Sequence, residues 1–152
     1  MTSRRLEKAI QKLYIAFHNN QLNPACCKQC AVGNMCDNID SWKNFTDQHG
    51  SLELNQLGRL NQRFGRRHFG YLPSELLRVE AVFLKACGYK LPLTRKTLKE
   101  TASVSKDQIF DGLSAVVAYL CALDGVQNYM DYSKVFEYDE MGAIYDVEEV
   151  LA

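Results

Sequence analysis

Residues 105–123 read SKDQIFDGLSAVVAYLCAL, which is the most apolar stretch of the chain and predicts its central core helix. The Ser105 and Gln108 side chains match a capping box, in which each accepts a hydrogen bond from the other residue's backbone N–H. Asp124-Gly125 is a typical helix end. Apolar residues share one face of this helix: Ile109, Phe110, Leu113, Val116, Val117, Leu120 and Cys121. We expect the other helices to pack against it.

Two further long helices are predicted, one at the N-terminus and one near the middle of the chain. One runs from Thr2 or Ser3 to Asn19, and the other starts at Leu72-Pro73 and ends at Gly88. The first has an apolar face of Leu6, Ile10, Leu13, Tyr14 and Phe17. The second has Leu76, Val79, Glu80, Phe83 and Cys87 on one side, with Leu77 and Leu84 adjoining.

Three shorter helices are predicted between these two. The first begins with Asn23 as its cap and Pro24 in its first turn, and ends at Gly33-Asn34. The second runs from Ser41 to His49-Gly50. The third is indicated by the helical spacing of Leu54, Leu57, Leu60 and Phe64.

Together these segments predict an all-α fold, a compact single-domain bundle of five or six helices. Residues 89–104 lack clear periodicity and are expected to form a long connection. We expect a helical domain over residues 1–125 and an acidic, Tyr-rich tail over residues 126–152, partly packed on it, with a short helix near 132–136. No strand pair is indicated.

Composition fits one soluble globular domain. The chain has 152 residues, of which 47% are hydrophobic and 24% charged. Its longest apolar run, residues 113–123, is far shorter than the roughly 20 residues that span a bilayer. The N-terminus mixes charges of both signs instead of forming a secretory signal. We therefore expect a cytoplasmic protein with reduced thiols and no membrane association.

Charge is divided along the chain although the net charge is zero. Residues 1–106 contain 17 Lys and Arg against 8 Asp and Glu, whereas residues 107–152 contain one Lys against 10 Asp and Glu. The two parts are expected either to attract each other within the fold or to present basic and acidic faces to partners. Solvated surface without a partner is the alternative.

Four cysteines cluster in one early segment: Cys26, Cys27, Cys30 and Cys36. On the helix predicted from Asn23, the first three share an arc of roughly 100° with Cβ atoms about 5–6 Å apart at the closest pairs. Thiol pKa values fall near a helix N-terminus and beside a cation such as Lys28. This arrangement favours soft-metal binding or thiol redox chemistry over disulfides.

A zinc-type site is the leading prediction for these thiols. Cys27 and Cys30 have the C-x₂-C spacing of one half of such a site, and zinc takes three or four ligands. The remaining ligands are sought among Cys26, Cys36 and His18, with His49, Cys87 and Cys121 as further alternatives. An iron–sulfur centre on the same residues ranks below zinc. The competing interpretation is that the cysteines are buried core residues, which we expect for Cys87 and Cys121.

An arginine-rich segment over residues 63–71 is a second candidate site. Its sequence, RFGRRHFGY, contains Arg63, Arg66, Arg67 and His68 among aromatics and glycines. Guanidinium groups bind phosphate or carboxylate through paired hydrogen bonds, which makes an anion or a partner protein one candidate ligand here. Alternatively, the arginines pair with acids of the chain itself. The segment is too short to predict a nucleic-acid surface, and no catalytic signature or nucleotide-binding loop is present.

Three stretches resemble a family of short bacterial proteins that carry the name of the flavoprotein subunit of the sodium-translocating NADH–quinone reductase. They are residues 22–34 (LNPACCKQCAVGN), 65–71 and 112–120. The resemblance implies a redox or electron-transfer accessory role. The full-length flavoprotein of that reductase is membrane-anchored and has iron–sulfur, FAD and NADH domains. This chain has Met130 where the flavin motif needs Arg, and it reverses the cysteine gaps of the ferredoxin motif, so no FAD or NAD is expected.

The sequence thus supports three functional hypotheses. The first is a helical protein whose cysteine-based zinc site has a structural or interaction role. The second is a redox accessory protein that uses the same thiols. The third is a binding module that uses the arginine-rich segment, with the cysteines buried. An unidentified protein partner fits the first and third.

Overall fold

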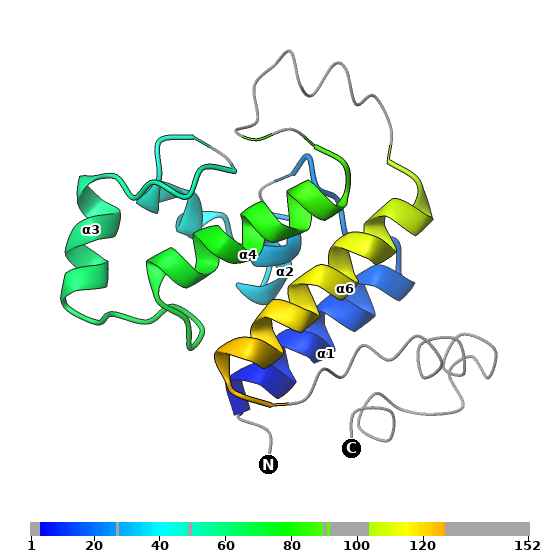
Figure 1. Cartoon of the computed structure of the whole chain (residues 1–152), viewed down its shortest axis with the longest axis horizontal. Coiled ribbons are helices and arrows are strands. Elements are labelled where there is room, and N and C mark those ends of the chain that lie inside the picture. The colour runs from blue at the N-terminus through cyan, green and yellow to red at the C-terminus, as the bar shows by residue number, and fades with distance from the viewer. Residues whose placement is uncertain (1–3, 27, 49, 90, 92–103, 127–152) are drawn as a thin grey trace.

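The computed structural model describes residues 4–26, 28–48, 50–89, 91 and 104–126, and these form an all-α fold (Figure 1). The elements are α1 (Arg4–His18), α2 (Ala31–Met35), the 3₁₀ helix η1 (Ser41–Phe45), α3 (Gln56–Arg63), α4 (Pro73–Ala86) and α6 (Lys106–Leu123). The predicted tail from residue 127 and most of the predicted connection lie outside the described residues. None of the described helices is long and apolar enough to cross a membrane.

The core lies where α1, α4 and α6 meet, with α2 beside α1 and α4 (Figure 1). Helix α6 begins with the predicted capping box, because Ser105 and Gln108 each accept from the other's backbone N–H at 3.2 and 2.9 Å. Most of its predicted apolar face is buried: Leu113, Val116, Val117, Leu120 and Cys121. The prediction of a central helix here is confirmed.

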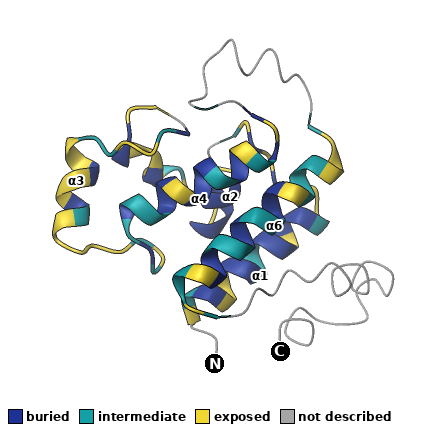
Figure 2. Ribbon diagram, viewed as in Figure 1, coloured by how far each residue is buried: buried dark blue, intermediate teal, exposed yellow. Residues whose placement is uncertain are grey.

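Helices α1 and α4 also confirm their predicted faces. The five apolar residues of the α1 face are all buried. On α4, the Glu75 carboxylate accepts from the Leu72 N–H at 2.8 Å at the start of the helix. The helix ends before Gly88, whose φ of +100° favours glycine. Figure 2 shows the buried sides of α1, α4 and α6 turned toward one another.

The helix predicted from Asn23 is wrong in its position. Residues 23–26 and 28–30 form turns, and α2 starts only at Ala31, so Gly33 and Asn34 lie inside the helix that they were expected to end. Asn23 does cap a local structure, since its Oδ1 accepts from the Ala25 N–H at 3.0 Å, but that structure is a turn. Cys26 and Cys30 therefore do not lie together on one helix.

The segment before α3 contains a shorter helix than predicted. The helix expected from Ser41 to His49 is a single 3₁₀ helix that ends at Phe45, because Thr46 adopts an extended backbone. The Thr46 hydroxyl donates to the Glu53 carbonyl at 2.8 Å, and the Asn55 N–H bonds the Phe45 carbonyl at 2.8 Å. These bonds hold α3 against η1.

Candidate functional site

The cysteine-rich segment is a loop held by two asparagine side chains. The buried Asn34 amide donates to the carbonyls of Gln29 and Cys30 at 2.8 and 3.1 Å. The Asn38 amide donates to the Lys28 carbonyl at 2.8 Å. The two amides thus donate hydrogen bonds to three carbonyls of the loop. These bonds fix the loop to α2.

The described sulfur atoms have different environments. Cys30 is fully buried, and its Sγ accepts a hydrogen bond from the Gly33 N–H at 3.3 Å, so it serves as the N-cap of α2. Cys36 is buried, and burial raises the pKa of its thiol to about 12. Cys26 is partly exposed, and Cys27 lies outside the described residues.

The predicted metal ligands are not gathered in the described part of the chain. There, no three His, Cys, Asp or Glu side chains are placed to hold an ion. The His18 ring instead contacts the rings of Tyr14 and Phe17, with centroids 5.3 and 5.4 Å away. A zinc site that includes Cys27 stays a prediction. Cys87 and Cys121 are fully buried, which confirms their predicted place in the core.

The arginine-rich segment forms a tight turn between α3 and α4. His68 and Tyr71 exchange two backbone hydrogen bonds of 2.7 and 3.1 Å. Arg67 donates to the Gly70 carbonyl at 3.2 Å and lies 3.7 Å from the Glu75 carboxylate. The His68 ring packs on Phe45, with centroids 4.7 Å apart. Two of the four predicted anion ligands are therefore held by other parts of the fold: Arg67 by Gly70 and Glu75, and His68 by Tyr71 and Phe45.

Arg5 of α1 connects this turn with the end of α6. Its guanidinium donates twice to Asp124, at 2.5 and 2.9 Å, and once to the Gly70 carbonyl at 2.8 Å. It also lies over the Tyr71 ring, 4.5 Å from the centroid. Sequence reasoning missed this role, because nothing local distinguishes Arg5 from the neighbouring Arg4.

Helix α3 presents its large apolar side chains to solvent. Leu57 and Leu60 are each 48% exposed, and Phe64 after the helix is 64% exposed. At about 100° per residue these three positions share an arc of roughly 60°. The small Gly58 and the polar Asn61 are buried instead. Figure 2 shows α3 as a largely exposed helix at one end of the molecule.

Three exposed arginines lie on α3 or directly after it, and one of them, Arg59, lines a hollow that also contains Asp47 and Glu53. Arg59, Arg63 and Arg66 are exposed, and among the described residues no carboxylate forms an ion pair with any of them. The Arg66 guanidinium lies 5.6 Å from the Phe64 ring centroid. The three apolar residues of the stripe and the two arginines next to it are called the α3 face below: Leu57, Leu60, Phe64, Arg63 and Arg66. Leu57 and Leu60 also line a shallow hollow with Asn44, Asp47, Asn55 and Gln56.

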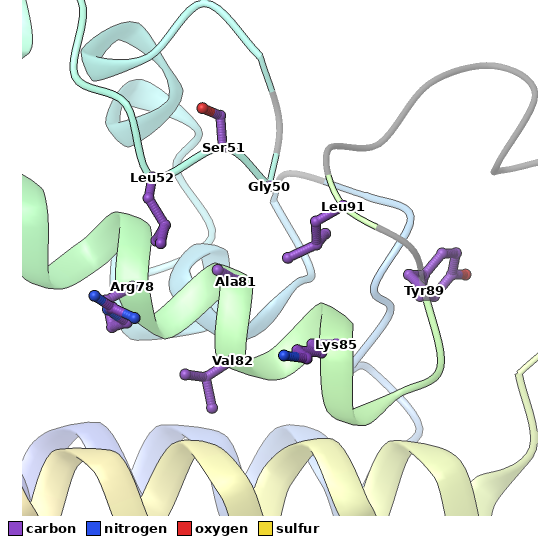
Figure 3. A pocket seen from close by; sticks show the side chains of 9 residues that line it. All are labelled: Gly50, Ser51, Leu52, Arg78, Ala81, Val82, Lys85, Tyr89 and Leu91. Carbon is purple, nitrogen blue, oxygen red and sulfur yellow. The ribbon is translucent and has the colours of Figure 1, made fainter.

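A second concave surface lies on α4. It is an open groove of about 840 Å³ whose lining includes Ala81 and Val82 of α4. Figure 3 shows Leu52 and Leu91 approaching α4 from two different segments. The groove also contains the cations of Arg78 and Lys85, so its described lining is apolar with positive charge.

Comparison with protein-family models, with curated proteins and with solved structures found no match to this chain. The resemblance to proteins named after the sodium-translocating reductase therefore stays a prediction.

Proposed function

We propose that this protein is a binding module that holds an acidic, apolar segment of a partner protein on the α3 face. The observation that carries this proposal is the orientation of α3. A helix in a globular protein normally turns its apolar stripe toward the core. Here the stripe is turned outward, and Gly58 and Asn61 occupy the inward side.

The inward side of α3 is shaped to bring the helix close to η1. A Cβ at Gly58 would clash with the Phe45 carbonyl oxygen, so only glycine permits this approach. The Asn55 side chain caps the helix by accepting from the Gly58 N–H at 2.9 Å. These contacts fix which side of α3 faces outward, and they leave Leu57, Leu60 and Phe64 without a large buried surface.

Covering the apolar stripe would stabilise a complex. Apolar surface contributes about 25 cal/mol for each Å² removed from water. Exposed apolar patches bordered by polar groups are typical of protein interfaces. Phe64, the most exposed of the three, lies in the stripe next to Arg66, and aromatic residues and arginines are enriched among interface hot spots.

The charge of the surface indicates the chemistry of the partner. Arg63 and Arg66 lie beside the apolar stripe without a carboxylate partner among the described residues. Guanidinium groups match carboxylates in geometry and charge. A segment with Asp or Glu beside apolar side chains would therefore satisfy both parts of the α3 face at once.

The described cysteines support this third hypothesis more than the first two. Cys30 is used as a helix cap, and burial raises the pKa of Cys36 to about 12, so the Cys36 thiol is protonated near neutral pH. The thiol of Cys36 is therefore suited to packing.

Selection of peptide ligands tests the proposal. A displayed library of random peptides is selected on the full chain, and each ligand is then measured against the L60S/F64S variant by fluorescence anisotropy. We expect ligands that combine acidic and apolar residues, and we expect the variant to bind them at least about ten-fold more weakly, because it loses two anchor side chains.

The matched control is I15S, since Ile15 of α1 is also 48% exposed but lies on another helix. This variant should bind the selected peptides like the wild type. Ligands that bind L60S/F64S as tightly as the wild type, or that carry net positive charge, would contradict the proposal.

A further inference from the structure

We propose that residues 127–152 of the chain itself occupy the α3 face and compete there with the partner. This segment is called the acidic segment below. The inference rests on the proposed function, because it assigns an occupant to the same surface. It makes the α3 face a site that is closed by its own chain until a partner displaces the acidic segment.

The composition of the acidic segment matches the α3 face. It contains seven Asp and Glu against the single Lys134, and its acids alternate with apolar residues, as in VFEYDEM over residues 135–141 and IYDVEEVL over residues 144–151. Carboxylates beside large apolar side chains are the chemistry that the arginines and the apolar stripe select. No other stretch of the chain is similarly acidic.

The acidic segment also starts near the turn that follows α3. Asp124, three residues before it, is bonded to Arg5, and the same guanidinium donates to the Gly70 carbonyl. Arg67 donates to that carbonyl as well. The end of the described chain is therefore tied to the turn that follows α3.

The acidic segment is long enough to contact the α3 face. A chain of 26 residues spans up to about 85 Å when extended, whereas the eight residues of α3 extend over about 12 Å. A tethered segment of this length acts at an effective concentration of about 1 mM. A contact of only modest intrinsic affinity would then keep the α3 face occupied in the absence of a partner.

The test compares the full chain with a variant in which six acids of the segment are neutralised: E137Q, D139N, E140Q, D146N, E148Q and E149Q. The probe is a synthetic peptide with the natural sequence of residues 127–152, and its binding is measured by fluorescence anisotropy. We expect the neutralised variant to bind the probe at least about ten-fold more tightly than the wild type, because its α3 face is vacant.

The control is D107N/D111N, which removes two exposed acids from α6 and should bind the probe like the wild type. Hydrogen exchange gives an independent readout, and residues 56–64 should exchange faster in the neutralised variant than in the wild type. Circular dichroism confirms that each variant keeps its helix content.

The outcomes separate the two proposals. If the wild type and the neutralised variant bind the probe equally, and L60S/F64S abolishes binding to both, the intramolecular contact is excluded and the proposed function stands. If neither chain binds the probe, the acidic segment is not a ligand of the α3 face, and the selected peptides alone decide the proposed function.

Discussion

Burial controls the chemistry of two thiols in the core. It raises the pKa of both Cys36 and Cys87 to about 12, above the usual range for cysteine. Both thiols are therefore protonated near neutral pH, whereas the sulfur of Cys26 belongs to a partly exposed residue. The three residues differ in environment although their side chains are identical.

The raised thiol pKa values predict a loss of stability in alkali. The folded state holds these two protons more tightly than the unfolded state does. The stability that this difference contributes is therefore fully present below the unfolded thiol pKa. It is lost as the pH rises from about 9 to about 12. Urea midpoints should fall across this range, and they should fall less steeply in C36A/C87A. Equal slopes in the wild type and in C36A/C87A would show that the two buried thiols do not titrate in this way.

In helix α3 the apolar residues that repeat with helical spacing face solvent and not the core. The spacing of Leu57, Leu60 and Phe64 predicts the helix correctly, but Gly58 and Asn61 occupy the inward positions. The periodicity of an amphipathic helix identifies two faces, and it does not tell which neighbour will cover the apolar one. The close approach of Gly58 to η1 decides the orientation here.

Because of this orientation, a substitution at the small Gly58 should cost more stability than one at the large Leu60. In Gly58→Ala the new Cβ would meet the Phe45 carbonyl, and we expect a loss of about 1–3 kcal/mol despite the better helix propensity of alanine. Leu60→Ala should change the free energy of unfolding by less than about 0.5 kcal/mol, because Leu60 is half exposed. Chemical denaturation measures both, and a larger loss in Leu60→Ala than in Gly58→Ala would place the apolar stripe in the core.

The position of α2 could not be predicted from local signals. Asn23-Pro24 is a strong helix start in sequence, but the structure uses Asn23 for a turn. Helix α2 instead depends on the Asn34 side chain, which bonds carbonyls of the preceding loop. Such tertiary bonds can outweigh local propensity, which is a weak preference. The predicted convergence of the cysteines assumed a helix from Asn23 and therefore lost its geometric basis.

At the scale of the whole molecule, the sequence predicted the all-α architecture and three of its helices with their buried faces. These are α1, α4 and α6, which have long apolar periodicity and clear caps, so local and tertiary preferences agree. The α3 face was predicted only in part, through Arg63 and Arg66. Its apolar stripe needed the structure, because exposure of a side chain depends on the packing of distant elements.

Arg5 joins three distant parts of the chain: α1, the turn at Gly70 and the end of α6. Its hydrogen bonds to the Asp124 carboxylate are charge-assisted, and the Asp124 side chain is 6% exposed. Arg5→Ala should therefore lower the free energy of unfolding by about 2 kcal/mol. Arg4→Ala is the matched control, because Arg4 is exposed, and thermal denaturation should show little change. Similar effects of both substitutions would exclude a special role for Arg5.

Mapping of a bound ligand by NMR tests the central claim most directly. The full chain with the six neutralised acids, labelled with ¹⁵N, is titrated with a selected acid–apolar peptide. The largest amide shift changes should fall in residues 56–66, which contain the α3 face, and they should be lost in L60S/F64S. Changes centred on the α4 groove at Arg78 and Lys85, or on the cysteine loop, would contradict the account.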